Sequence, residues 1–323
     1  MKEYILIIIV GFSLTSCFDS KRQPRHNVYR PEFDISNDNR RILCSFYEND
    51  KASVYQVDVT DNKKQKVTPE NEYSFIKPVL SPDNKHVACI AESLTDAIKG
   101  KLCIIDIVTH SLTELTSDSV LILEYIFDPS GKSIYFTAAG HFGNYSPVAR
   151  KAPHEINIFN VDITTKKVMQ ITDYDAYDLH GLSITNNGDS LLFHLIVRSK
   201  TGLFWMNIQN KRLTKVSASN DLRADKKATP YEYYSPILSR DNSKIVFSEP
   251  YELYIMDRKT KISKLIFRNE PSLVNVGAAK FFNGYNYLIL TLPRPTDRKD
   301  NSGDNFGFYT LNPETNELKT LDL

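Results

Sequence analysis

Residues 80–91 read LSPDNKHVACIA, and this stretch decides the fold. A short apolar segment leads into Ser-x-Asp-Asn, and apolar residues then recur at every second position, which is typical of a strand with one buried face. Five related segments lie along the chain: ISNDNRRILCSF from Ile35, FDPSGKSIYFTA from Phe127, ITNNGDSLLFHL from Ile184, LSRDNSKIVFSE from Leu238 and KFFNGYNYLILT from Lys280. The same hairpin is therefore predicted six times.

The turn of each hairpin carries Asn or Gly, the residues that tolerate the positive φ of a tight turn. These residues are Asn39, Asn84, Gly131, Gly188, Asn242 and Gly284. Buried positions are predicted three residues later, at Ile42, Val87, Ile134, Leu191, Ile245 and Tyr287. The next buried positions are predicted at Cys44, Cys89, Phe136, Phe193, Phe247 and Ile289.

A second pattern follows each hairpin and consists of an apolar strand that ends in Asp or Asn. The terminal residues are Asp58, Asp106, Asp162, Asn207, Asp257 and Asn312. Because they recur in every unit, we interpret them as structural Asx turns rather than as catalytic acids. A short strand closes each unit, so four strands repeat about every 48 residues, as in a propeller blade. The predicted fold class is all-β, a six-bladed β-propeller of four-stranded blades over residues 33–323.

These repeats resemble the WD-like repeats of TolB-type six-bladed propellers, as the unit from LSPDNK to LCIIDIVTHSLTELT illustrates. Similar repeats occur in the propellers of prolyl oligopeptidases and in oligogalacturonate lyase. The resemblance implies the fold but says little about function, because the repeated residues build the blade. Two features depart from these families: the segment before residue 33 is too short for a TolB-type N-terminal domain, and no Gly-x-Ser-x-Gly nucleophile elbow occurs.

The first sixteen residues, MKEYILIIIVGFSLTS, have the charged start and short apolar run of a secretory signal peptide. Leu14 to Cys17 resemble the lipobox of bacterial lipoproteins, which implies that Cys17 carries acyl chains. Polar residues 17–32 are then a lipidated tether. Because Phe18 and not Asp follows the cysteine, outer-membrane anchoring is preferred, with the domain facing the periplasm or the cell surface. The alternative is a buried N-terminal strand or helix.

The composition disfavours a nucleic-acid partner and does not decide whether two of the cysteines form a disulfide. Among the 323 residues, 40 Lys and Arg balance 39 Asp and Glu, which disfavours a nucleic-acid-binding surface. Cys44, Cys89 and Cys103 are odd in number, so at least one is unpaired within the chain. We interpret them as free buried thiols, with a Cys89–Cys103 disulfide as the alternative.

Binding residues are expected on the propeller face that carries the long loops, because rigid scaffolds present function there. Long connections lie in blade 3 (residues 138–155), in blade 6 (293–307) and in the crossings 172–181 and 215–235. Aromatic, His and Arg side chains favour ligand and protein interfaces. The candidate partner-binding residues are His141, Tyr145, Arg150, His154, Tyr177, His180, Tyr233, Tyr234, Arg294 and Arg298. The alternative is that these loops are solvated covers and that His180, the best single candidate, is structural.

No catalytic residue, metal ligand or cofactor is predicted. Two acidic clusters, Asp173 with Asp175 and Asp178, and Asp297 with Asp300 and Asp304, lack the spacing of a calcium loop and are interpreted as solvated charges. The functional prediction is a non-enzymatic binding or scaffolding propeller, anchored by lipid in a bacterial membrane, for an envelope protein or glycan.

Two alternatives remain. One is an enzyme like oligogalacturonate lyase, which implies a histidine and an axial metal acting on acidic oligosaccharides. That resemblance favours ligands from several blades, whereas His141, His154 and His180 all belong to blade 3 or its exit. The other is a structural subunit of a larger envelope complex, as TolB-type proteins are.

Overall fold

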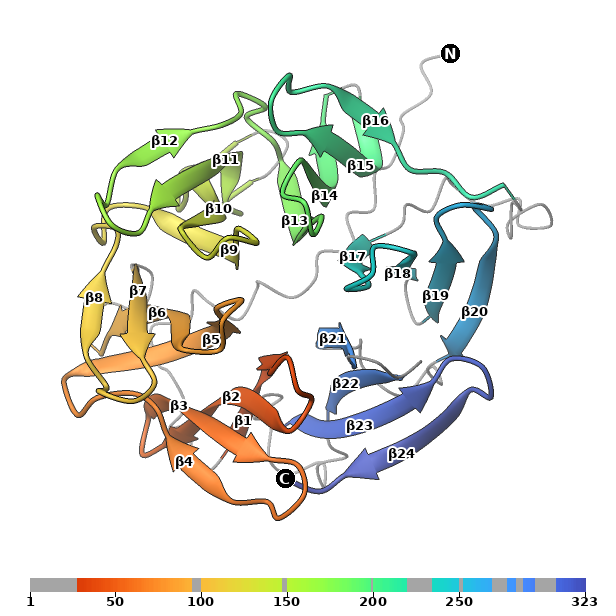
Figure 1. The fold of residues 1–323 in the computed structure, drawn as a ribbon. Helices are drawn as coiled ribbons and strands as arrows, with labels where there is room; N and C mark the ends of the chain where they lie inside the picture. Colours follow the sequence, from red (N-terminus) through yellow and green to blue (C-terminus); the bar gives the residue numbers. More distant parts are fainter. Residues whose placement is uncertain are drawn as a thin grey trace.

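The computed structural model describes residues 28–94, 100–146, 150–198, 200–219, 234–249, 252–268, 278–282, 287–293 and 306–323. All regular elements in these ranges are β-strands, grouped into six four-stranded antiparallel sheets (Figure 1). The sheets stand around a central axis as blades, which confirms the predicted six-bladed propeller. No helix long and apolar enough to cross a membrane is found in the described part of the chain.

The strands of each blade run in order from the axis to the rim. Blade 1 contains β1 (Val28–Ile35), β2 (Arg41–Glu48), β3 (Lys51–Asp58) and β4 (Lys64–Lys66). Blade 2 contains β5 (Tyr73–Leu80), β6 (His86–Ser93), β7 (Gly100–Asp106) and β8 (Leu112–Glu114). Blade 3 contains β9 (Leu121–Phe127), β10 (Ser133–His141), β11 (His154–Asp162) and β12 (Val168–Gln170).

The second half of the ring repeats this arrangement. Blade 4 contains β13 (Asp178–Ile184), β14 (Ser190–Val197), β15 (Lys200–Asn207) and β16 (Leu213–Lys215). Blade 5 contains β17 (Tyr234–Leu238), β18 (Lys244–Glu249), β19 (Glu252–Asp257) and β20 (Ser263–Arg268). Blade 6 contains β21 (Ala278–Phe281), β22 (Leu288–Pro293), β23 (Phe306–Asn312) and β24 (Glu317–Leu321). Blades 3 and 6 lie opposite each other across the axis (Figure 1).

The predicted hairpin turns are confirmed in the first five blades. Their turn residues have φ between 58° and 73°: Asn39, Asn84, Gly131, Gly188 and Asn242. Gly284 lies outside the described residues. The positions three residues after these five turns are fully buried, as predicted: Ile42, Val87, Ile134, Leu191 and Ile245.

Blade 6 departs from the predicted register by one residue. Tyr287, predicted to be buried, is exposed, and Leu288 is fully buried instead. The reason is the strand pairing, since Phe281 faces Leu288 with the same separation by which Ile35 faces Ile42 in blade 1. The pairing of β21 with β22 therefore begins one residue later than the Gly284 pattern predicts.

The acids and amides that end each third strand form Asx turns. In every blade the side-chain Oδ1 accepts a hydrogen bond from a backbone N–H two or three residues later. The residues are Asp58, Asp106, Asp162, Asn207, Asp257 and Asn312. These short turns and the hairpin turns lie on one face of the ring, called here the turn face. The opposite face is called the loop face.

The innermost strands of blades 2, 4 and 5 each contain a bulge that shifts the pairing register. A residue with positive φ lies at each bulge: Lys77 at 55°, Gly181 at 71° and Ser235 at 45°. In blade 4 this residue also packs closely against blade 5, because a Cβ atom added to Gly181 would lie 2.2 Å from Cδ of Pro236. Only glycine combines this φ with this close approach.

The core fills the spaces between neighbouring blades. Phe136, Phe193 and Phe247 are buried at equivalent positions, as predicted. Cys44, Cys89 and Cys103 are buried free thiols. Cys89 faces Cys103 across β6 and β7, and burial raises the pKa of the Cys103 thiol to about 12.

Each blade is built from one continuous segment, including the two that meet where the ring closes. At this seam between blades 6 and 1, the rings of Phe33 and Phe308 pack edge to face with centroids 5.5 Å apart. Thr291 Oγ1 donates a 2.8 Å hydrogen bond to Pro31 O. The innermost strand β1 starts at Val28, so residues 28–32 belong to the blade and not to the predicted tether.

Candidate functional site

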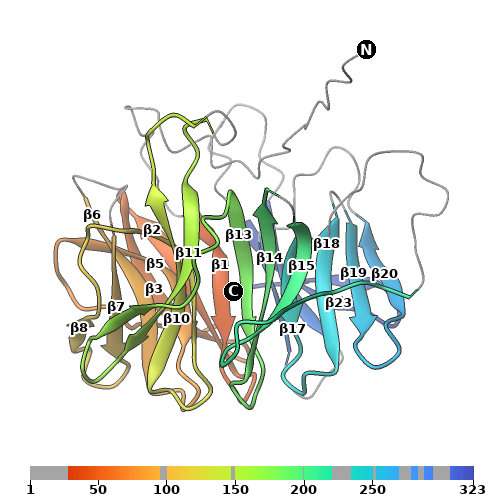
Figure 2. The same cartoon turned by 90° about the horizontal axis from the view of Figure 1, so that it is seen from above.

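The hairpin of β10 and β11 holds four of the predicted binding residues and projects beyond the neighbouring strands (Figure 2). His141 and His154 face each other across it, with ring centroids 5.6 Å apart. His141 Nε2 lies 3.1 Å from Oε2 of Glu155. Tyr145 is 73% exposed near the tip, and Arg150 is exposed as well. His141, Tyr145 and Arg150 are thus exposed on one protruding element, whereas His154 is buried.

Two further predicted residues, Tyr177 and His180, lie apart from this hairpin at the start of blade 4. Tyr177 directly precedes β13 and is partly buried, and its N–H donates to Ile196 O at 2.9 Å. His180 lies within β13, the innermost strand of the blade. The structure therefore divides the predicted residues between a projecting hairpin and a position close to the axis.

The remaining predicted residues lie outside what the structure describes. These are Cys17, Tyr233, Arg294 and Arg298, together with Asp297, Asp300 and Asp304 of the second acidic cluster. Tyr234 begins β17, but only its backbone is described.

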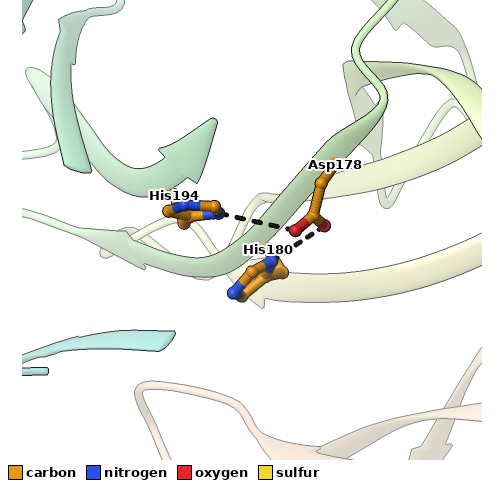
Figure 3. A group of neighbouring side chains, drawn as sticks. All are labelled: Asp178, His180 and His194. Carbon is orange, nitrogen blue, oxygen red and sulfur yellow. Dashed lines mark hydrogen bonds and ion pairs between the residues drawn. The ribbon is translucent and has the colours of Figure 1, made fainter. Parts of the chain in front are cut away.

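Three side chains of blade 4 form a cluster whose ligand atoms lie within 4.8 Å of one another: Asp178, His180 and His194 (Figure 3). His180 Nδ1 lies 2.9 Å from Asp178 Oδ1, and His194 Nδ1 lies 3.5 Å from Asp178 Oδ2. The two imidazole rings face each other with centroids 4.6 Å apart. One carboxylate therefore serves two histidines through its two oxygens.

The strand geometry explains how these residues meet. Asp178 and His180 are two positions apart on β13, so they share one face of the strand. His194 lies on β14 as the direct cross-strand partner of His180. The opposite face of the same strands carries Leu179, Phe193 and Leu195, which pack against blade 3. The histidine face is thus turned towards blade 5.

Burial and charge together shift the pKa values of Asp178 and His180. His194 is fully buried, whereas His180 and Asp178 are partly exposed. Burial opposes ionisation of Asp178, but ion pairing with His180 and hydrogen bonds from both imidazoles outweigh it and hold its pKa well below the ordinary value. Burial also opposes protonation of His180, yet the Asp178 charge raises the pKa of this histidine above its ordinary value.

The neighbouring blades contact this cluster through their innermost strands. The N–H of Ser235, on β17 of blade 5, points at His180 Nε2 at 3.3 Å. From blade 3, Glu124 Oε2 accepts hydrogen bonds from the N–H groups of Gly181 and Leu182 at 2.7 and 3.0 Å. The bulge after His180 is therefore held from both sides, which fixes the direction of the histidine.

This arrangement corrects the interpretation of Asp178 as a solvated loop charge. Asp178 lies in a strand and faces two imidazoles, because the crossing before β13 is shorter than the sequence suggests. His194 was not among the predicted site residues, since it lies within the apolar run SLLFHLIV and resembles a core position. Two imidazoles and a carboxylate can transfer protons or bind a transition-metal ion.

The turn-face end of the axis has a different character. A cavity of about 190 Å³ lies there, and its charged lining residues are Asp34, Arg240 and Lys280. Arg240 Nη2 donates to Ile35 O at 3.2 Å, which links blade 5 to blade 1. Lys280 Nζ lies 3.5 Å from Asp34 Oδ1. The three charged side chains therefore form contacts between neighbouring blades.

Solved structures similar to this chain share its fold at low sequence identity. TolB from Acinetobacter baumannii gives a TM-score of 0.62 at 15% identity, covering 91% of this chain and 62% of that one, which is less than two thirds of its length. An oligogalacturonate lyase from Vibrio parahaemolyticus gives 0.60 at 9% identity, with 93% and 84% coverage. A chain of a nidogen/laminin complex gives 0.58 at 8% identity, with 92% and 93% coverage.

No family model matches the chain, and neither does any curated protein sequence. The similar structures include a lyase as well as a chain of a protein complex, so the fold alone does not assign a function. The chain therefore has a six-bladed propeller with distant structural similarity to TolB and to oligogalacturonate lyase.

Proposed function

We propose that this chain is an exported, lipid-anchored propeller of the bacterial cell envelope that binds a protein or glycan partner at its loop face. The observation that carries this proposal is the β10–β11 hairpin, which projects beyond the neighbouring strands (Figure 2). Its connection carries the exposed side chains of Tyr145 and Arg150. Protruding aromatic and Arg side chains are typical anchors of binding interfaces. The turn face, in contrast, consists of short turns whose side chains bond their own backbone.

A photo-reactive amino acid at position 145 should give a discrete cross-linked adduct in intact cells. The matched control is position 108, because Val108 is 83% exposed on a turn of the opposite face, against 73% for Tyr145. We expect the adduct at position 145 and none at position 108. Protease or glycosidase treatment of the adduct then distinguishes a protein partner from a glycan. Equal adducts at both positions, or none at either, contradict binding through the loop face.

A second candidate function is an enzyme like oligogalacturonate lyase, and one observation favours it. The cluster of Asp178, His180 and His194 offers titratable groups at the axis, where sequence patterns alone placed only His180. The assay is release of unsaturated product from oligogalacturonate with added Mn²⁺. Product formation that is lost in His180→Ala would contradict the non-enzymatic proposal and establish the lyase. We expect no product.

Lipid anchoring has its own test, because it rests on the resemblance of residues 14–17 to a lipobox. Cells fed a labelled fatty acid should incorporate label into the wild-type protein and into Cys103→Ala, but not into Cys17→Ala. Denaturing gels read the label independently of folding. A wild-type protein recovered in the soluble fraction, or equal labelling of the Cys17→Ala variant, excludes acylation at Cys17.

A further inference from the structure

We propose that Asp178, His180 and His194 bind a divalent transition-metal ion, for which Zn²⁺ is the representative probe. The donor set is two imidazole nitrogens and one carboxylate oxygen. Such a set suits Zn²⁺ and its neighbours in the first transition row, whereas Ca²⁺ and Mg²⁺ prefer oxygen ligands alone. This site is independent of the proposed loop-face binding function.

The three ligand groups lie close enough together to converge on one ion. One ligand atom from each residue lies within 4.8 Å of the other two. Zn²⁺ binds nitrogen and oxygen at about 2.0–2.2 Å, so adjacent ligands in a tetrahedral site stand about 3.4 Å apart. His180 Nδ1 lies 2.9 Å from Asp178 Oδ1 and His194 Nδ1 lies 3.5 Å from Asp178 Oδ2, so the carboxylate would turn to offer one oxygen to an ion shared with both imidazoles.

The surroundings hold the ligands in place before any ion arrives. His194 is fully buried in the strand pair, and its partner His180 is fixed by the bulge that Glu124 and Pro236 support from the neighbouring blades. Preorganised ligands of this kind reduce the cost of ordering a site.

The site has three protein ligands, so a bound ion would keep at least one open position. His180 and Asp178 retain partial exposure, which lets water or a ligand reach that position. All three residues belong to blade 4. The site therefore differs from the arrangement with ligands from several blades that the lyase resemblance favours.

Metal binding through Nδ1 also changes the outer hydrogen bond of His180. A neutral imidazole bound at Nδ1 carries its proton on Nε2, where the N–H of Ser235 now points at 3.3 Å. Two donors would then face each other. Ion binding is thus expected to shift β17 of blade 5, and amide hydrogen exchange at Ser235 should change when the site is filled.

The experiment titrates chelator-treated full-length protein in detergent with ZnCl₂ by calorimetry. We expect one strong site per chain in the wild type and a loss of affinity of about 100-fold or more in His180→Ala and Asp178→Asn, since even outer partners of metal ligands contribute about 10–100-fold. Both substituted residues are partly exposed, so folding is retained more readily than in a variant of the buried His194. Asp178→Asn also keeps an oxygen acceptor for the imidazoles.

Two additional measurements make the result decisive. The thermal midpoint of the wild type should rise with Zn²⁺ concentration, because an ion that binds only the folded state stabilises it by mass action. Co²⁺ should give visible absorption bands in the wild type and not in His180→Ala. The control is His141→Ala, which removes one histidine of the other facing pair beside Glu155 and should keep the Zn²⁺ site intact.

Several outcomes would overturn the proposal. One is the absence of saturable Zn²⁺ binding in the wild type, and another is unchanged affinity in both His180→Ala and Asp178→Asn. If Zn²⁺ binding were lost in His141→Ala but retained in His180→Ala, the binding site would be assigned to the projecting hairpin instead. In each of these cases the cluster of Asp178, His180 and His194 is a structural hydrogen-bond network only.

Discussion

Replacement of Phe193 by Ala should lower the free energy of unfolding by about 3–5 kcal/mol, because truncation of a buried aromatic side chain leaves a cavity that the surroundings only partly fill. Phe193 is fully buried on β14 and packs between blades 3 and 4. Denaturant-induced unfolding followed by circular dichroism measures the change.

The matched control is Met169→Ala on β12, where the side chain is exposed. Surface substitutions of this kind usually change stability by less than about 0.5 kcal/mol. If Phe193→Ala costs less than about 1 kcal/mol, position 193 does not pack between the blades as described. A far-ultraviolet spectrum dominated by helix would contradict the fold itself.

Gly181→Ala should destabilise the protein by about 2–5 kcal/mol. Two effects add: a side chain at positive φ costs about 1–2 kcal/mol, and overpacking costs about 1–3 kcal/mol. Gly181 has φ of 71°, and an added Cβ would lie 2.2 Å from Cδ and 2.8 Å from N of Pro236. Neither ring atom of the proline can yield without moving β17, so blades 4 and 5 would be pushed apart.

Gly143→Ala separates the two effects. Gly143 has φ of 81°, but an added Cβ would meet no atom within 4 Å. This variant should show only the conformational cost of about 1–2 kcal/mol. Thermal and denaturant unfolding of both variants measure the difference. Equal costs for the two glycines would show that blades 4 and 5 are not in close contact at Pro236.

The sequence predicts the blades well because the turns repeat. Asn39, Asn84 and Asn242 have the positive φ that their position in the hairpin demands, and the residues after them alternate as the pleat requires. In blade 6 the repeat is less regular. Counting three residues from Gly284 predicts Tyr287 as the buried position, and this prediction is wrong. The cross-strand pairing of Phe281 with Leu288 sets the register in this blade. Pairing is a property of two strands, so a single segment of sequence does not reveal it.

The candidate site is harder to predict for a related reason. A regular hairpin extended from the pair Ile184 and Leu191 would place Leu195, not His194, opposite His180. The bulge between His180 and Ser183 shifts the register by one residue and brings the two histidines together. Its sequence signal is a single glycine at position 181. The sequence pattern groups Asp178 with neighbouring acids and offers no partner for His180, because the pairing of His180 with His194 depends on the bulge.

The continuity of each blade determines how the ring can be rearranged. Since no sheet borrows a strand from the far end of the chain, a break in any crossing between blades would leave all six sheets whole. The only bonds lost would be those of the linking segment itself. Blades 6 and 1 already meet without a shared strand, through contacts such as Phe33 with Phe308 and Thr291 with Pro31. The chain termini could therefore lie between any two neighbouring blades with the same six sheets retained. A whole blade is accordingly the unit that can be duplicated, deleted or exchanged.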